Sequence, residues 1–106
     1  MPKELVAASA TPLVLSLLSR GDSYGYEIIQ RVREVSNGRL EWTDGMLYPI
    51  LHRLEEQGLV KSFWRESETG RKRKYYRILE AGRRALGEQR DQWNAVHAAL
   101  RKVGDG

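Results

Sequence analysis

One segment near the middle of the chain constrains the fold most. Residues 43–60, TDGMLYPILHRLEEQGLV, start at a capping threonine, carry apolar residues at helical spacing, and reach Gly58 near their end. Two stretches rich in β-branched and aromatic residues follow at 60–65 and 74–79, with the turn residues SETG between them. A helix that is followed directly by a hairpin with the basic flank GRKRK is the order of a winged helix-turn-helix.

Two more helices are predicted upstream. Pro12 marks the first turn of one helix, and residues 3–10 either extend it across a bend or form a separate helix. Asp22 or Ser23 caps the second helix, which Ser36-Asn37-Gly38 ends. Together with the middle helix, they form the three-helix core of a helix-turn-helix unit.

The pattern becomes helical again from residue 81 to residue 103. Its seam positions step by three and four residues, as in helices that pair with another helix: Leu86, Gln89, Trp93, Val96, Leu100 and Val103. We therefore assign residues 1–79 to a winged helix-turn-helix DNA-binding domain and residues 80–106 to a C-terminal dimerisation helix. The expected fold class is mainly α with a small β-hairpin, built as a single compact module.

The middle helix offers a surface for contacts to DNA. Its spacing buries four apolar residues, Leu47, Ile50, Leu51 and Leu54. That register turns Asp44, Tyr48 and His52 outward as one row, with Thr43 at the start of the helix. We expect the helix N-terminus to hold phosphates, Tyr48 and His52 to contact base edges, and Asp44 either to cap the helix or to accept a hydrogen bond from cytosine. Alternatively, Pro49 only shapes the first turn and Tyr48 packs on the hairpin.

Four consecutive cations follow Gly70 at the predicted hairpin tip: Arg71, Lys72, Arg73 and Lys74. A charge run by itself is usually a solvated turn. Because this one follows a helix of the recognition type, we expect it to neutralise a sugar-phosphate chain or to enter the minor groove. The formal charge of +4 also suits double-stranded DNA as the partner.

Several other functions are disfavoured. The chain has no cysteine, which excludes disulfides and thiolate metal sites and agrees with a cytoplasmic location. Its two histidines, His52 and His97, lack clustered ligands, and no phosphate loop or serine-elbow motif is present. No apolar stretch has the length of a membrane span. We expect a protein that is not an enzyme, needs no cofactor or metal, and contacts no membrane.

Three stretches, in this order, closely resemble PadR-type transcriptional regulators: YGYEIIQRV at 24–32, LYPILHRLEEQGLV at 47–60 and GRKRKYYRILEAGRRAL at 70–86. The resemblance covers nearly the whole chain. The single C-terminal helix is similar to the short PadR subclass. The stretch SNGRLEW and SFW at 62–64 are similar to its LmrR-type members, which sense drugs.

This resemblance implies a homodimeric repressor that binds an inverted-repeat promoter operator and is released by a ligand or a stress signal. It places Tyr24, Tyr48 and the basic residues 71–74 against DNA. The chain departs from the family at Leu79, where a threonine commonly caps the last helix. Because leucine cannot cap, we expect this helix to begin later or to fray.

The apolar seam of the last helix also points to a dimer interface and an effector site. We expect Leu5, Val6 and Ala8 of a partner chain to cover this seam. A two-fold axis near Trp93 would bring two indoles together around a small aromatic effector, with Leu5, Ala8 and His97 beside it. LmrR-type members carry an acidic residue where this chain has His97, which argues against a cationic ligand. Alternatively, Trp93 only fills the dimer core.

A second class of function stays open. Winged helices also bind proteins, and the basic hairpin would then dock an acidic partner without specific DNA binding. The two functions differ in a measurable way, because only contacts to DNA phosphates release condensed counterions and make affinity depend steeply on salt.

Overall fold

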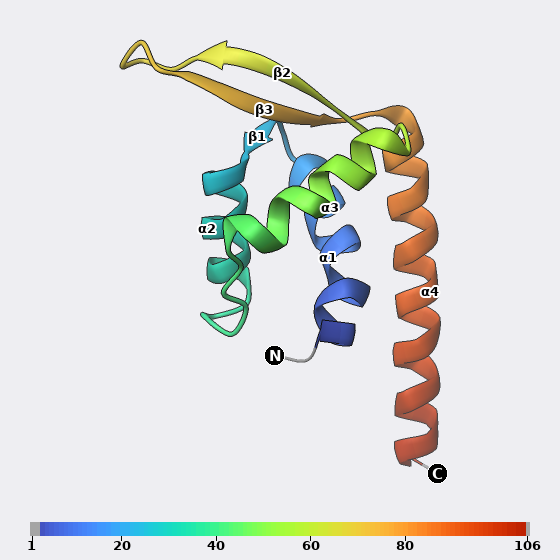
Figure 1. Cartoon of the computed structure of the whole chain (residues 1–106). Helices are drawn as coiled ribbons and strands as arrows, with labels where there is room; N and C mark the ends of the chain where they lie inside the picture. Colours follow the sequence, from blue (N-terminus) through green and yellow to red (C-terminus); the bar gives the residue numbers. More distant parts are fainter. Residues whose placement is uncertain (1–2, 106) are drawn as a thin grey trace.

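The computed structural model describes the backbone of residues 3–105 and the side chains of residues 10–105. These residues form four helices and one small sheet (Figure 1), in the order α1 Lys3–Leu18, β1 Ser23–Tyr24, α2 Gly25–Val35, α3 Asp44–Glu56, β2 Val60–Glu66, β3 Lys72–Ile78 and α4 Glu80–Asp105. The sheet lies across one end of the first three helices, and α4 projects away from it beside them. The predicted fold class, a mainly helical winged helix-turn-helix with a long last helix, is confirmed.

The sheet has three antiparallel strands in the order β1-β3-β2. The predicted cap of the second helix at Asp22 or Ser23 is wrong, because Ser23 and Tyr24 instead pair with β3 opposite Tyr76 and Tyr75. Tyr24 occupies the N-cap position, and the Ser23 hydroxyl donates to Glu27 Oε1 at 2.6 Å. A two-residue strand that exists only through its partner leaves no periodic signal in the sequence.

One hydrophobic core joins the helices to the inner face of the sheet. The four apolar residues predicted for α3 are all buried: Leu47, Ile50, Leu51 and Leu54. Tyr76 and Ile78 of β3 and Val60 of β2 cover them from the sheet. The register of the recognition-type helix is therefore confirmed, and it determines which side of α3 faces solvent.

Helix α1 runs through Pro12 without a break, so residues 3–10 extend the helix rather than forming a separate one. The prediction that Pro12 lies in the first turn is wrong, because the helix already begins at Lys3. Proline removes one helical hydrogen bond, but Val14, Leu15 and Leu18 are almost completely buried on the turns after it. Burial of those side chains offsets the lost bond. Among residues 3–105, none of the helices has both the length and the apolarity needed to cross a bilayer.

Helix α4 begins at Glu80, directly after Leu79, so the expectation of a later start or fraying is wrong. The Leu79 carbonyl accepts from the Arg83 amide at 3.0 Å, and the Leu79 amide donates to the Leu59 carbonyl at 2.9 Å. Gly82 lets the first turn lie directly on the chain before β2, where a Cβ atom would overlap the Leu59 carbonyl oxygen. Close packing and backbone bonds therefore replace the missing side-chain cap.

Candidate nucleic-acid interface

A hollow with a volume of about 580 Å³ lies between the helices and the hairpin. Residues from β1, α2, α3 and both hairpin strands line it: Tyr24, Gly25, Tyr26, Tyr48, Trp64, Arg71, Lys72, Arg73 and Lys74. We call this hollow the reading cleft. It brings together two tyrosines and all four cations that the sequence predicted, whereas Thr43, Asp44 and His52 are not among its lining residues.

Helix α3 presents the predicted outward row. Asp44, Tyr48 and His52 are all exposed, and the Tyr48 and His52 rings lie 6.4 Å apart between centroids. Thr43 occupies the N-cap position, so Asp44 is the first helical residue rather than the cap. The Thr43 carbonyl accepts a hydrogen bond from the Leu47 amide at 3.0 Å, while the Thr43 side chain makes no capping hydrogen bond. The first turn of α3 therefore has no side-chain cap from Thr43, and the acidic Asp44 lies in this turn, where the helix dipole favours negative charge.

Tyr48 packs against the start of α2. A Cβ atom at Gly25 would lie 2.7 Å from the Tyr48 hydroxyl oxygen, so the glycine makes room for the phenol. The Tyr48 side chain nevertheless keeps 38% of its surface exposed. The contact with Gly25 fixes one side of the ring against α2, and Tyr48 also shares the reading cleft with residues of the hairpin.

The sequence predicted that all four basic residues lie at the hairpin tip, and this prediction is wrong. Only Arg71 belongs to the connecting loop, since Lys72, Arg73 and Lys74 form the start of β3. They pair with β2 residues opposite them, with Lys74 opposite Trp64. Because neighbouring strand residues point to opposite faces, Lys72 and Lys74 share the face of the buried Tyr76, and Arg73 lies on the other face.

Arg73 is held by Tyr24. Its Nη1 donates to the Tyr24 hydroxyl at 3.0 Å, and its guanidinium carbon lies 4.5 Å from the centroid of the Tyr24 ring. The Tyr24 ring also meets Tyr75 edge-on, at 5.2 Å between centroids. These contacts join β1 to β3 and place one cation and one phenol at the border of the reading cleft.

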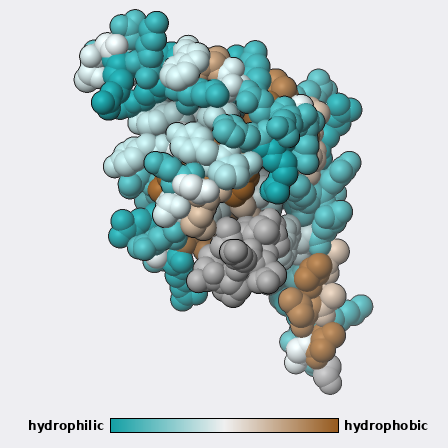
Figure 2. Space-filling model, in the orientation of Figure 1, coloured by the Kyte–Doolittle hydropathy of each residue, from teal (hydrophilic) through white to brown (hydrophobic). Residues whose placement is uncertain are grey.

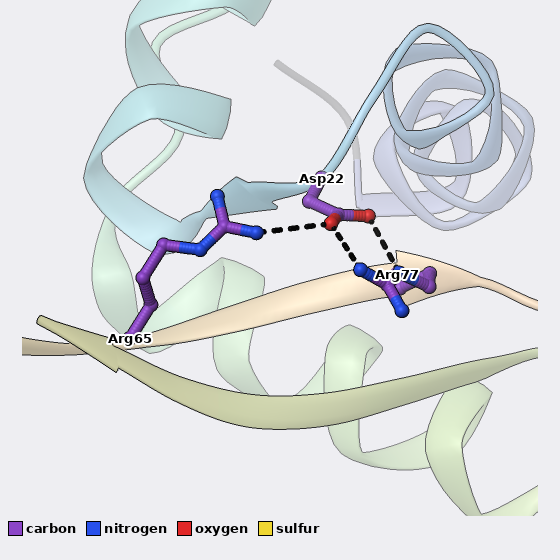
Figure 3. Close-up of polar contacts among 3 residues, drawn as sticks. All are labelled: Asp22, Arg65 and Arg77. Atoms are coloured by element: carbon purple, nitrogen blue, oxygen red, sulfur yellow. Dashed lines mark hydrogen bonds and ion pairs between the residues drawn. The ribbon is translucent and has the colours of Figure 1, made fainter.

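Asp22 fixes the outer face of the sheet (Figure 3). Arg77 donates to both carboxylate oxygens, at 3.0 Å to Oδ1 and 2.8 Å to Oδ2, and Arg65 reaches Oδ2 at 3.4 Å. The hydrogen bonds from Arg77, followed by the charges of both arginines, lower the pKa of Asp22 although burial opposes the shift. One carboxylate thereby connects both long strands to the loop before β1.

A second carboxylate ties α3 to the hairpin. Glu55 Oε2 accepts from the Ser62 amide at 3.0 Å and from the Ser62 hydroxyl at 2.5 Å. The bond from the Ser62 hydroxyl is the main reason that the pKa of Glu55 is lowered, and the charges of Lys74 and His52 add to it. The helix and β2 therefore keep a fixed spacing beside the reading cleft.

Three lining residues of the cleft were not predicted from the sequence: Gly25, Tyr26 and Trp64. Tyr26 and Trp64 are exposed to 65% and 67%, although both are large aromatic side chains. The position of Trp64 could have been predicted from the sequence, because Val60, Ser62 and Trp64 must share one face of the strand. The position of Tyr26 could not, because the direction of its side chain depends on the residue at which α2 begins.

The C-terminal half of α4 is exposed and apolar. Its outward row consists of Trp93, Val96, Leu100 and Val103, with exposed fractions of 47%, 51%, 66% and 79%. Figure 2 shows apolar residues gathered at the free end of this helix. Leu86 differs from the prediction, because it is only 4% exposed and packs in the chain's own core. The exposed seam therefore begins beyond it, while Gln89 is half-buried.

A second hollow of about 650 Å³ adjoins this row, and α1, α3 and α4 line it through Thr11, Pro12, Arg53, Gln57, Gln89, Gln92, Trp93 and Val96. Of the residues predicted for an effector site, Trp93 lines this hollow, and His97 is exposed on α4 without lining it. The side chains of Leu5, Val6 and Ala8, which the sequence predicted to contribute to the dimer and effector sites, lie outside the described residues.

Comparisons with known proteins agree with this geometry. Residues 14–88 match the model of the transcriptional regulator PadR-like family. The chain is 34% identical over 89 residues to the transcriptional regulator YqjI of Escherichia coli, an alignment that covers 84% of this chain and 41% of that protein. The chain thus spans less than half the length of that relative.

Two solved structures are similar over almost their full length. A transcriptional regulator from Clostridium thermocellum superposes with a TM-score of 0.84 at 31% identity, covering 94% of this chain and 97% of that one. A PadR-like transcriptional regulator from Bacillus cereus superposes with a TM-score of 0.85 at 25% identity, covering 98% and 99% of the two chains.

Proposed function

Because the chain belongs to the PadR-like family of transcriptional regulators, and is therefore a regulator rather than an enzyme, we propose that it is a homodimeric repressor of transcription. Each protomer would bind one half of an inverted repeat in promoter DNA. The observation that carries this proposal is the reading cleft, which joins Tyr48 of α3 to Lys72 and Lys74 of the hairpin.

The proposed reading mode divides the work between α3 and the hairpin. The exposed row of α3 enters the major groove, where Tyr48 and His52 meet base edges and backbone amides at the start of α3 meet a phosphate. Lys72 and Lys74 bind phosphates of the neighbouring strand as mobile point charges. Arg73, held by Tyr24, contributes a fixed charge at the edge of the cleft.

The dimer would form along α4. Exposed Val96, Leu100 and Val103 make an apolar row that water solvates poorly and a second copy would cover. The helix has 26 residues and a length of about 39 Å, close to one turn of duplex DNA. The two winged helix-turn-helix units of a dimer, separated by such helices, would have the spacing that successive half-sites on one side of DNA require.

A small aromatic effector would bind near Trp93. The hollow that this indole lines also includes Arg53 of α3 and Gln57 directly after it, so an occupant would touch the reading helix directly. That proximity supports regulation of DNA binding by a ligand. The competing possibility, in which Trp93 only packs between the two protomers, predicts no change of tryptophan fluorescence when planar dyes are added to the folded dimer.

The DNA-binding proposal is tested by titrating a labelled duplex from the protein's own promoter region at several salt concentrations. A dimer that makes about eight to twelve phosphate contacts gives a slope of log K against log salt of about −7 to −11. A weak interaction that does not respond to salt or sequence would favour the protein-binding module instead. Tyr48→Ala should reduce the preference for the promoter sequence over unrelated duplexes.

A further inference from the structure

Trp64 is a large aromatic side chain whose exposure the fold does not explain. It lies on the inner face of β2, the face from which Val60 reaches the core, yet 67% of its surface is exposed. Trp42, by contrast, is 4% exposed. An exposed indole keeps a large apolar area in water, and any surface that covers it gains binding free energy.

The surroundings of Trp64 indicate the chemistry of that surface. Lys74 lies opposite it on β3, and Lys72 follows two residues away on the same face. Across the reading cleft, Tyr26 is 65% exposed and Tyr48 is 38% exposed. Aromatic faces between cations suit a partner that alternates negative charges with apolar rings, and a nucleic acid strand alternates phosphates with sugars and bases in this way.

The position of Trp64 in the fold does not favour a second copy of the chain as the cover. The exposed apolar row that a second copy would bury lies on the C-terminal half of α4. The hairpin extends from the start of α4 toward the opposite side of the molecule (Figure 1), so its distal half, which contains Trp64, points away from that row. A dimer that forms along α4 therefore leaves Trp64 open.

We propose that Trp64 is a DNA-contacting residue whose indole packs on a sugar or a base of the duplex, beside phosphates bound by Lys72 and Lys74. The proposal rests on the proposed DNA-binding function and adds an apolar contact to it. Because the indole carries no charge, its contribution to affinity does not depend on salt. The lysines, in contrast, contribute through counterion release, which salt weakens.

The test compares the duplex affinities of wild type, Trp64→Ala and Trp64→Phe across salt concentrations. Trp64→Ala should weaken binding about tenfold at every salt concentration with an unchanged slope, and Trp64→Phe should keep most of the affinity because an aromatic face remains. Lys72→Ala is the matched control, since it should lower the slope by about one. A sequence-dependent loss assigns the contact to a base, and a uniform loss assigns it to a sugar.

A second readout works without substituting Trp64. In Trp93→Phe protein, the emitting indoles are the buried Trp42 and the exposed Trp64, so added duplex should quench or shift the emission of Trp64. Unchanged emission on a bound duplex, together with wild-type affinity of Trp64→Ala, would overturn the inference and leave the DNA-binding function standing. If the wild type fails to bind any duplex at low salt, both proposals are wrong.

Discussion

At the scale of single residues, some polar side chains on or beside the sheet act by holding other side chains in place. Asp22 holds Arg77 and Arg65, and Tyr24 holds Arg73. The sequence predicted contacts with DNA for Tyr24 and Arg73 separately, without a bond between them. Their direct bond could not be predicted because it joins residues 49 positions apart, which only the pairing of β1 with β3 brings together.

Asp22→Asn should destabilise the fold by about 1 kcal/mol at neutral pH, since both arginines are half exposed and solvent screens the pairs. The pKa of Asp22 is lowered on folding, so the carboxylate stabilises the fold above its ordinary value of 3.8 and ceases to do so as the pH falls through the lowered pKa. Urea denaturation should show that the free energies of unfolding of wild type and Asp22→Asn differ by a constant amount near neutral pH. This difference should disappear in acid. Asp91→Asn, at an exposed site on α4, should leave stability unchanged.

Lys72→Ala should weaken binding to all duplexes to a similar degree and should reduce the salt slope by about one, because it removes one phosphate contact. Lys61→Ala is a control of equal charge from the same hairpin. Lys61 pairs with Arg77 on the outer face, away from the reading cleft. If anisotropy titrations gave the two variants equal slopes of log K against log salt, the face assigned to DNA would be wrong.

At the scale of elements, local periodicity predicted α3 correctly because its buried residues recur within its own sequence. The start of α4 was mispredicted for the opposite reason. Leu79 offers no cap, but Leu59, which lies 20 positions earlier, supplies the backbone acceptor that holds this turn. The basic run was misplaced in a similar way, since pairing with β2 extends β3 back to Lys72.

Gly82→Ala should destabilise the fold by about 1–3 kcal/mol, because the added methyl group would overlap the Leu59 carbonyl oxygen and crowd Ile78. Gly87→Ala is a matched control on the same helix, where a Cβ atom meets no neighbouring atom within 4 Å. That change should leave stability equal or raise it by about 0.5–1 kcal/mol. Thermal denaturation of both variants measures the contrast, and equal shifts would contradict the close packing of α4.

At the scale of the whole molecule, the chain measures 58 × 29 × 21 Å, because α4 and the hairpin extend away from the core. A small domain with a projecting apolar helix leaves much surface uncovered, which is the physical argument for a second copy. The sequence predicted the seam on α4, yet it could not show that Leu86 belongs to the chain's own core. Seam residues and core residues follow the same helical spacing.

Leu100→Glu should convert the dimer to a monomer and should lower affinity for the operator at least tenfold, since it places a charge within the apolar row of α4. Ala98→Glu introduces the same charge on the opposite side of this helix, at an exposed position. It should therefore leave the oligomeric state unchanged. Sedimentation measurements on both variants test this, and a Leu100→Glu protein that stays dimeric would rule out the seam as the interface.

The most direct test of the whole account is a hydroxyl-radical footprint on DNA that the protein retains from its own genome. Two heads joined along α4 should protect two half-sites of an inverted repeat, on one side of the duplex and about 10–10.5 base pairs apart or a multiple of that spacing. A single protected patch without a symmetry-related partner, or no protection at low salt, would contradict the account.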